Sequence, residues 1–131
     1  HGQWRPFINN SKIKLYHNPR CSKSRKALEL LSSQNIKFEI VKYLEVGILK
    51  KDLEYILKKL KFDKNSIVRK NEQTFKDLNI NVNESSIDEI IKFIVENPII
   101  IERPLAIKYQ YNELNDAIIG RPPEMILKLL N

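Results

Sequence analysis

The feature that most constrains the fold is a β-prone segment, a helix and a second β-prone segment within residues 13–41. Residues 13–16 (IKLY) and 38–41 (FEIV) are rich in the aliphatic and aromatic side chains that favour strands. Between them, Ala27, Leu28 and Leu31 recur at helical spacing. Two strands joined by a helix pair in parallel through a right-handed crossover, so this order predicts a βαβ unit.

A block of amphipathic helices is predicted next. Apolar residues at helical spacing indicate one helix over residues 53–60 and another over 87–95, with a shorter one over 72–78. Ser85 or Ser86, each with an acid three residues later, predicts a capping box at the start of the 87–95 helix. The Glu-Val-Gly segment before the block, residues 45–47, is predicted to be a turn.

The C-terminal part returns to strand. We expect strand at residues 99–101 and 105–109, around Arg103-Pro104, and a short strand at 117–119. Pro122 and Pro123 suit the first turn of a last helix. The whole order predicts a single α/β domain over residues 12–131. It is a thioredoxin-like fold, with a mixed four-stranded sheet and a helical insertion between the βαβ and ββα parts.

Length and composition agree with one domain. The chain has 131 residues, of which 42% are hydrophobic, and its first eleven residues show no periodic pattern. We interpret residues 1–11 as a remnant of cloning or display, or as a disordered arm. No apolar run is long enough to span a membrane, and one cysteine cannot form an internal disulfide, so we expect a soluble, cytoplasmic protein with no membrane partner. The net charge of +7 comes without a run of five basic residues. It therefore predicts a preference for anions, while nucleic acid is not an expected partner.

The single cysteine, Cys21, lies where the first predicted strand gives way to the first helix. The unpaired backbone N–H groups of Ser22, Lys23 and Ser24 and the positive end of the helix dipole would meet its sulfur there. Nearby cationic side chains add to this potential, and all these influences favour thiolate over thiol. The same N–H groups can bind a tetrahedral oxyanion. These residues favour a reactive cysteine over a buried structural one.

Three familiar thiol chemistries fail on spacing. A dithiol redox pair needs Cys-x-x-Cys, but position 24 is serine. A tyrosine-phosphatase loop needs arginine six positions after the cysteine, but position 27 is alanine. A zinc site needs several ligands, and only His17 and Cys21 are available beyond His1, so no metal is expected. A lone thiolate that does redox work must take its second thiol from outside, most plausibly from glutathione.

The stretch YHNPRCSKSR, residues 16–25, resembles the active-site motif of the glutaredoxin-coupled arsenate reductases. Further segments are similar in order and spacing to motifs of the same family: YLE at 43–45, VRKN at 68–71, NP at 97–98, IERP at 101–104 and GRP at 120–122. The likeness runs from about Lys12 to the C-terminus. The pair Ser22-Lys23 is more like a sister branch than the best-characterised reductases, which tend to have Gly-Thr there.

The resemblance implies an arsenate reductase that binds no cofactor, uses glutathione as co-substrate and has glutaredoxin as a partner. Cys21 would be the nucleophile that forms a thiol-arsenate adduct. Pro104 would be the cis-proline that faces it. Three arginines would hold the oxyanion, and planar guanidinium groups suit that role. These three are Arg69, Arg103 and Arg121. The residues expected to bind substrate or support the thiolate are His17, Ser22, Lys23, Ser24 and Arg25.

Two other classes remain open. A glutathione-linked thiol oxidoreductase with no arsenic role would share Cys21 but needs no three-arginine site. An Spx-like regulator that binds RNA polymerase would share the fold. Such regulators generally carry a Cys-x-x-Cys switch, which Ser24 removes here, whereas Arg103 and Arg121 are retained.

Overall fold

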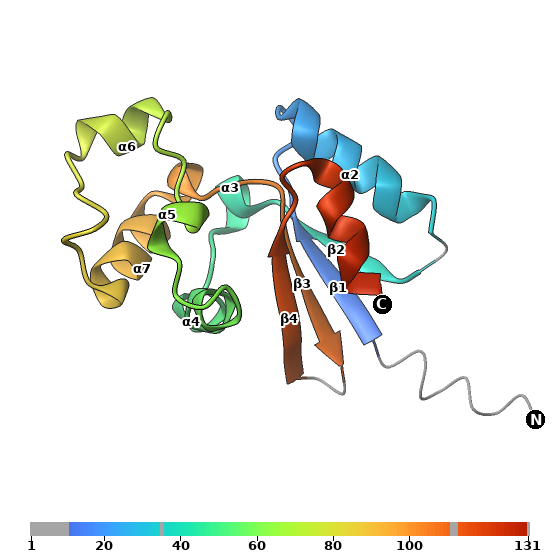
Figure 1. Cartoon of the computed structure of the whole chain (residues 1–131). Coiled ribbons are helices and arrows are strands. Elements are labelled where there is room, and N and C mark those ends of the chain that lie inside the picture. The colour runs from blue at the N-terminus through green and yellow to red at the C-terminus, as the bar shows by residue number, and fades with distance from the viewer. Residues whose placement is uncertain (1–10, 35, 111–112, 131) are drawn as a thin grey trace, which may run out of the picture.

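The computed structural model describes residues 11–34, 36–110 and 113–130, so the interpretation of the first ten residues lies outside it. Its centre is one four-stranded sheet with the strand order β2-β1-β3-β4 (Figure 1). β1 pairs with β2 in parallel, while the β1–β3 and β3–β4 pairs are antiparallel. The strands are β1 (Ser11–Tyr16), β2 (Phe38–Val41), β3 (Leu105–Gln110) and β4 (Glu113–Ile119). The predicted mixed sheet of thioredoxin-like type is confirmed.

Helices cover both faces of this sheet. In Figure 1 the helix after β1 and the last helix lie on one side, and the helices between β2 and β3 lie on the other. The flanking pair is α2 (Ser22–Ser32) and the 3₁₀ helix η2 (Pro123–Leu130). The insertion contains α3 (Tyr43–Val46), α4 (Lys50–Lys59), α5 (Lys64–Ile67), α6 (Gln73–Asp77), α7 (Ile87–Glu96) and the 3₁₀ helix η1 (Pro98–Ile100).

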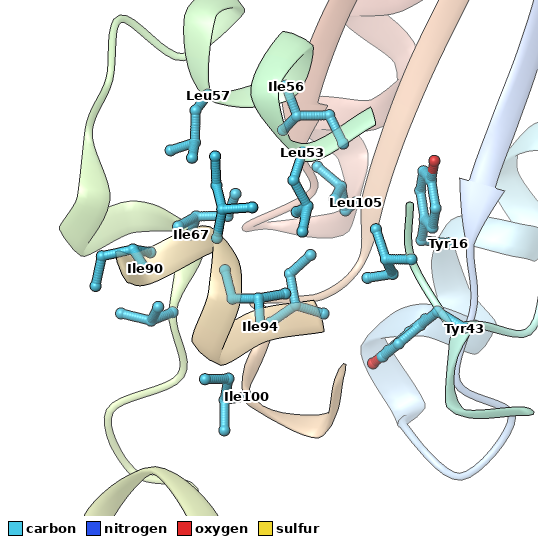
Figure 2. Close-up of a cluster of buried hydrophobic side chains, with 14 of the residues drawn as sticks. Tyr16, Tyr43, Leu53, Ile56, Leu57, Ile67, Ile90, Ile94, Ile100 and Leu105 are labelled. Atoms are coloured by element: carbon cyan, nitrogen blue, oxygen red, sulfur yellow. The ribbon is translucent and has the colours of Figure 1, made fainter. Parts of the chain in front are cut away.

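Alternating side chains along the strands give the sheet two cores. Ile13 and Leu15 of β1 and Ala106 of β3 pack under α2 and η2, because residues two apart in a strand share a face. The larger core lies under the insertion, and ten of its buried residues are labelled in Figure 2. These labelled residues are Tyr16, Tyr43, Leu53, Ile56, Leu57, Ile67, Ile90, Ile94, Ile100 and Leu105.

Local signals for the insertion hold well. α4 and α7 bury most of the predicted apolar positions, although Val95 is exposed. Ser86 and Glu89 form the capping box at the start of α7. Tyr16 at the end of β1 ties the sheet to the insertion, because its hydroxyl donates to Asp52 Oδ2 of α4 at 3.2 Å. Within the described residues, every helix is too short or too polar to cross a membrane.

Two local predictions are wrong. Residues 99–101 do not form a strand, because Pro98 begins the 3₁₀ helix η1 and Ile101 makes only an isolated bridge with Val68. A short apolar run that is fully buried looks the same in sequence whether it is strand or helix, which explains this error. The predicted turn at residues 45–47 is mostly the one-turn helix α3, which ends at Gly47 with φ of 80°.

Candidate active site

Cys21 is the N-cap residue of α2 and lies at the end of the loop that follows β1. Its backbone N–H donates to the carbonyl of Asn18 at 3.0 Å, and its own carbonyl accepts the first helical bond, from Arg25, at 2.9 Å. Its side chain is buried, with 9% exposed. The start of an eleven-residue helix therefore lies directly at the thiol, with the first-turn N–H groups and the positive helix end that favour an anion. The position of Cys21 agrees with the predicted junction between the first strand and the first helix, whereas its burial was not predicted.

A buried hydrogen-bond network holds the loop. The Ser24 side chain is fully buried; its Oγ lies 2.6 Å from His17 Nδ1 and accepts the backbone N–H of Asn18 at 3.0 Å. Burial lowers the pKa of His17, and the charges of Lys42 and Arg25 lower it further. A neutral imidazole can then accept a hydrogen bond from the Ser24 hydroxyl at Nδ1 and carry its own proton on Nε2. His17 and Ser24 thus fix the shape of the loop.

The remaining predicted loop residues lie on the outside of this turn. Arg25 donates through Nη1 to the carbonyl of Pro19 at 2.8 Å, which closes the loop from its exposed side. Ser22 and Lys23 are exposed in the first turn of α2. They are therefore placed to meet a molecule that approaches Cys21 from solvent, whereas their predicted role in binding stays a prediction.

Pro104 lies beside the cysteine loop because of strand pairing. Leu105 is the register partner of Tyr16, so the preceding residue, Pro104, lies next to the start of the loop at His17. The Arg103-Pro104 peptide bond is cis, as predicted. The N–H of Gly120 donates to the carbonyl of Pro104 at 2.8 Å. A Cβ at Gly120 would come within 2.8 Å of both the Pro104 ring and the Ile126 side chain, so only glycine allows this close approach.

The three segments that carry the predicted arginines meet at residues 100–104. The backbone N–H of Arg69 donates to the carbonyl of Ile100, and that of Glu102 donates to the carbonyl of Ile67, both at 2.7 Å. The guanidinium of Arg121 lies against the carbonyl of Arg103, with Nη1 at 3.4 Å from that oxygen. Residues far apart in sequence therefore reach one region beside Pro104. That all three guanidinium groups contact a single anion stays a prediction.

The three guanidinium groups differ in their partners. Arg69 Nη1 donates to Glu72 Oε2 at 3.0 Å, and Arg121 Nη1 donates to Glu102 Oε1 at 3.1 Å. By contrast, Arg103 Nε and Nη1 are buried and have no hydrogen-bond partner among the residues that the structure describes. Buried N–H groups normally have a partner, so this unpaired guanidinium indicates a place for an anionic ligand.

Tyr43 at the start of α3 links the cysteine and the arginines. Its side chain is 1% exposed, and Figure 2 shows its hydroxyl pointing away from that of Tyr16. Burial raises the pKa of Tyr43 to about 12. Arg103 and Cys21 both lie near enough to influence this phenol: the Arg103 charge lowers the pKa of Tyr43, and a negative charge at Cys21 would raise it. The phenol stays protonated and can donate a hydrogen bond at neutral pH.

Sequence reasoning did not assign roles to Tyr43, Glu72 or Glu102. Two of them lie in the YLE and IERP motifs, which offered a signal, whereas Glu72 follows VRKN directly and offered none beyond its spacing from Arg69. For metal ions, the described ranges contain no group of three or more His, Cys, Asp or Glu side chains that could hold one.

Fold and site together define a thioredoxin-like protein with one thiol at a helix start and an unpaired arginine beside the cis-proline. Known proteins agree with this class. The family model described as the ArsC family matches residues 16–129. The chain belongs to the ArsC family.

Individual relatives are similar over almost their whole length. The arsenate reductase of Haemophilus influenzae is 38% identical over 117 residues, which are 88% of this chain and 97% of that protein. An uncharacterised protein of Escherichia coli K12 is 37% identical over 119 residues, or 90% of this chain and 96% of the relative. The solved structure of an arsenate reductase from Vibrio cholerae has a TM-score of 0.78 and 34% identity, with 89% of this chain and 96% of that chain covered.

Proposed function

We propose that this protein reduces arsenate to arsenite, with glutathione as co-substrate and a glutaredoxin as partner. The observation that carries the proposal is that Nε and Nη1 of Arg103 are buried without a partner among the described residues, directly before the cis-proline beside the Cys21 loop. A guanidinium with free N–H groups suits a tetrahedral oxyanion such as arsenate. Two relatives named arsenate reductase, which are 38% and 34% identical to this chain, support the same substrate.

In the proposed first step, the Cys21 thiolate attacks arsenic and forms an S–As bond, while one arsenate hydroxyl takes a proton from solvent and leaves as water. Arg103 binds the oxyanion, and the first-turn N–H groups of α2 stabilise negative charge near the sulfur. His17 bonds to Ser24 and keeps the loop in place. Because its pKa is lowered, the imidazole is neutral and is not an imidazolium acid beside the thiolate. The step thus uses groups already placed around Cys21.

The second step takes two electrons from two thiols. Glutathione forms an S–S bond with Cys21, and the electron pair released from the S–As bond reduces As(V) to As(III). Arsenite leaves, and Cys21 is left as a mixed disulfide with glutathione. A glutaredoxin then removes the glutathione and restores the thiol. An outside thiol is required because the chain has a single cysteine.

A coupled assay tests the proposal. The protein is mixed with arsenate, glutathione, glutathione reductase and a glutaredoxin proven active on a standard mixed disulfide, and NADPH oxidation is followed. We expect oxidation that depends on arsenate and saturates with it. No arsenate-dependent oxidation by the wild-type protein under these conditions would show that the substrate is wrong.

The same assay separates the two alternatives. A glutathione-linked oxidoreductase without an arsenic role would consume NADPH with a mixed disulfide and show no dependence on arsenate. An Spx-like regulator would do neither. Ser24 gives no support to a dithiol switch, since its buried hydroxyl is engaged by His17 and by the Asn18 N–H.

A further inference from the structure

One carboxylate oxygen joins two of the arginine-bearing segments. Glu102 Oε1 accepts the backbone N–H of Arg103 at 3.0 Å and the side-chain Nη1 of Arg121 at 3.1 Å. The Glu102 side chain is 20% exposed, whereas that of Arg121 is 40% exposed. The partly buried carboxylate therefore joins the more exposed Arg121 side chain to the backbone N–H of Arg103.

The same contact removes a charge from the site. Arg69 is paired with Glu72 and Arg121 with Glu102, so these two pairs are close to neutral when no ligand is bound. Only Arg103 has buried N–H groups that are free within the described part of the chain. An arriving anion meets one uncompensated guanidinium, and it must share or displace a carboxylate to gain the second one.

We propose that Glu102 is a positioning residue: it holds Arg121 at the anion site and limits the site's affinity for tetrahedral oxyanions. This inference deepens the proposed function and rests on it. The ligand and Glu102 compete for the Arg121 guanidinium. The affinity therefore stays low for an anion that binds without forming a bond to Cys21. An anion that also bonds to Cys21 gains an interaction that does not depend on Arg121. Glu102 thereby lowers the fraction of sites that sulfate or phosphate, which only bind, can occupy.

Binding of inorganic sulfate tests this without any need for turnover. Titration calorimetry at constant ionic strength compares the wild-type protein with Glu102→Gln, which keeps an oxygen acceptor for both N–H groups but loses the charge. We expect sulfate to bind about fivefold more tightly to Glu102→Gln, as expected for release of a partly exposed ion pair. Glu39→Gln is the matched control, because Glu39 pairs with Lys12 on β1, and it should leave sulfate affinity unchanged.

Two further variants separate positioning from charge. Glu102→Ala removes both the charge and the acceptor, so it should bind sulfate less tightly than Glu102→Gln does. In the double variant Glu102→Gln with Arg121→Ala, the gain should disappear, since it depends on the freed Arg121 guanidinium. Circular dichroism and thermal unfolding establish that each variant is folded before affinities are compared.

Steady-state kinetics give the second measurement. Sulfate should inhibit arsenate turnover by Glu102→Gln at about fivefold lower concentration than it inhibits the wild-type protein. Unchanged sulfate affinity in Glu102→Gln, or a gain that persists without Arg121, overturns the inference. If sulfate binding follows the expectation but arsenate is not reduced, Glu102 keeps its role and the proposed substrate is the part that fails.

Discussion

The two halves of the site are built in opposite ways. The cysteine half is contiguous, from Tyr16 to Arg25, and its buried polar groups bond to one another. The arginine half combines three distant segments and leaves the Arg103 guanidinium unpaired among the described residues. The comparison teaches that the position of the nucleophile is fixed locally and needs no ligand. The proposed affinity for an anion, in contrast, would depend on tertiary pairing and on N–H groups that have no partner among the described residues.

The largest effect should come from removing the thiol. Cys21→Ser is expected to abolish arsenate-dependent NADPH oxidation, because no other thiol exists in the chain to form the adduct. Sulfate binding measured by calorimetry should survive, since it relies on the arginine half. Loss of sulfate binding together with turnover would mean that the two halves are not independent.

Next in size is the loss of the unpaired guanidinium. Arg103→Ala should lower kcat/KM for arsenate. The loss corresponds to about 1.5–3 kcal/mol of transition-state stabilisation, the range for hydrogen bonds to charged groups. Arg103→Lys should restore only part of it, because one ammonium cannot hold two oxygens in a fixed plane. Arg69→Ala should cost less, since its Nη1 already donates to Glu72. Equal losses at both positions would contradict the distinction between paired and unpaired arginines.

The cysteine half can be broken at its buried hydroxyl. Ser24→Ala leaves the Asn18 N–H and His17 Nδ1 without their partner, so the free energy of unfolding should fall by about 1–3 kcal/mol. Urea denaturation measures this. Ser32→Ala, on the same helix, is the control: its exposed hydroxyl donates only to the Leu28 carbonyl, and its removal should change stability little. Similar losses in the two variants would show that the buried network is not special.

The smallest effect concerns pH. Burial lowers the pKa of His17 in the folded protein below its value of about 6.5 in the unfolded chain. The unfolded chain therefore binds this proton more readily. The stability linked to neutral His17 is complete above about pH 6.5 and is lost as the pH falls through the lower, folded-state pKa. Urea midpoints from pH 8 to 5 should decline less steeply for His17→Asn than for the wild type. Parallel profiles would exclude His17 as a source of the decline.

The same contrast explains what could be predicted from sequence. The cysteine loop was predictable because its residues are neighbours and its helix start follows from local signals. The sheet followed from the order of strands and helices, and the cis Arg103-Pro104 bond was expected from the motif around it. The roles of Glu72 and Glu102 were not predictable, because they arise from side-chain pairing after the chain has folded. Residues 99–101 were wrongly assigned to a strand because a short apolar run has no periodicity that separates a strand from a helical turn.

The close approach at Gly120 also shapes how this chain can change over evolutionary time. The Pro104 ring and the Ile126 side chain occupy the space that a side chain at position 120 would need. Position 120 is therefore coupled to two others: one beside the cysteine loop and one in the C-terminal helix. A library that varies residue 120 alone should return glycine, whereas larger residues become acceptable only with a smaller side chain at 126 and a shifted proline. The sequence is constrained here as a group of three positions, not one at a time.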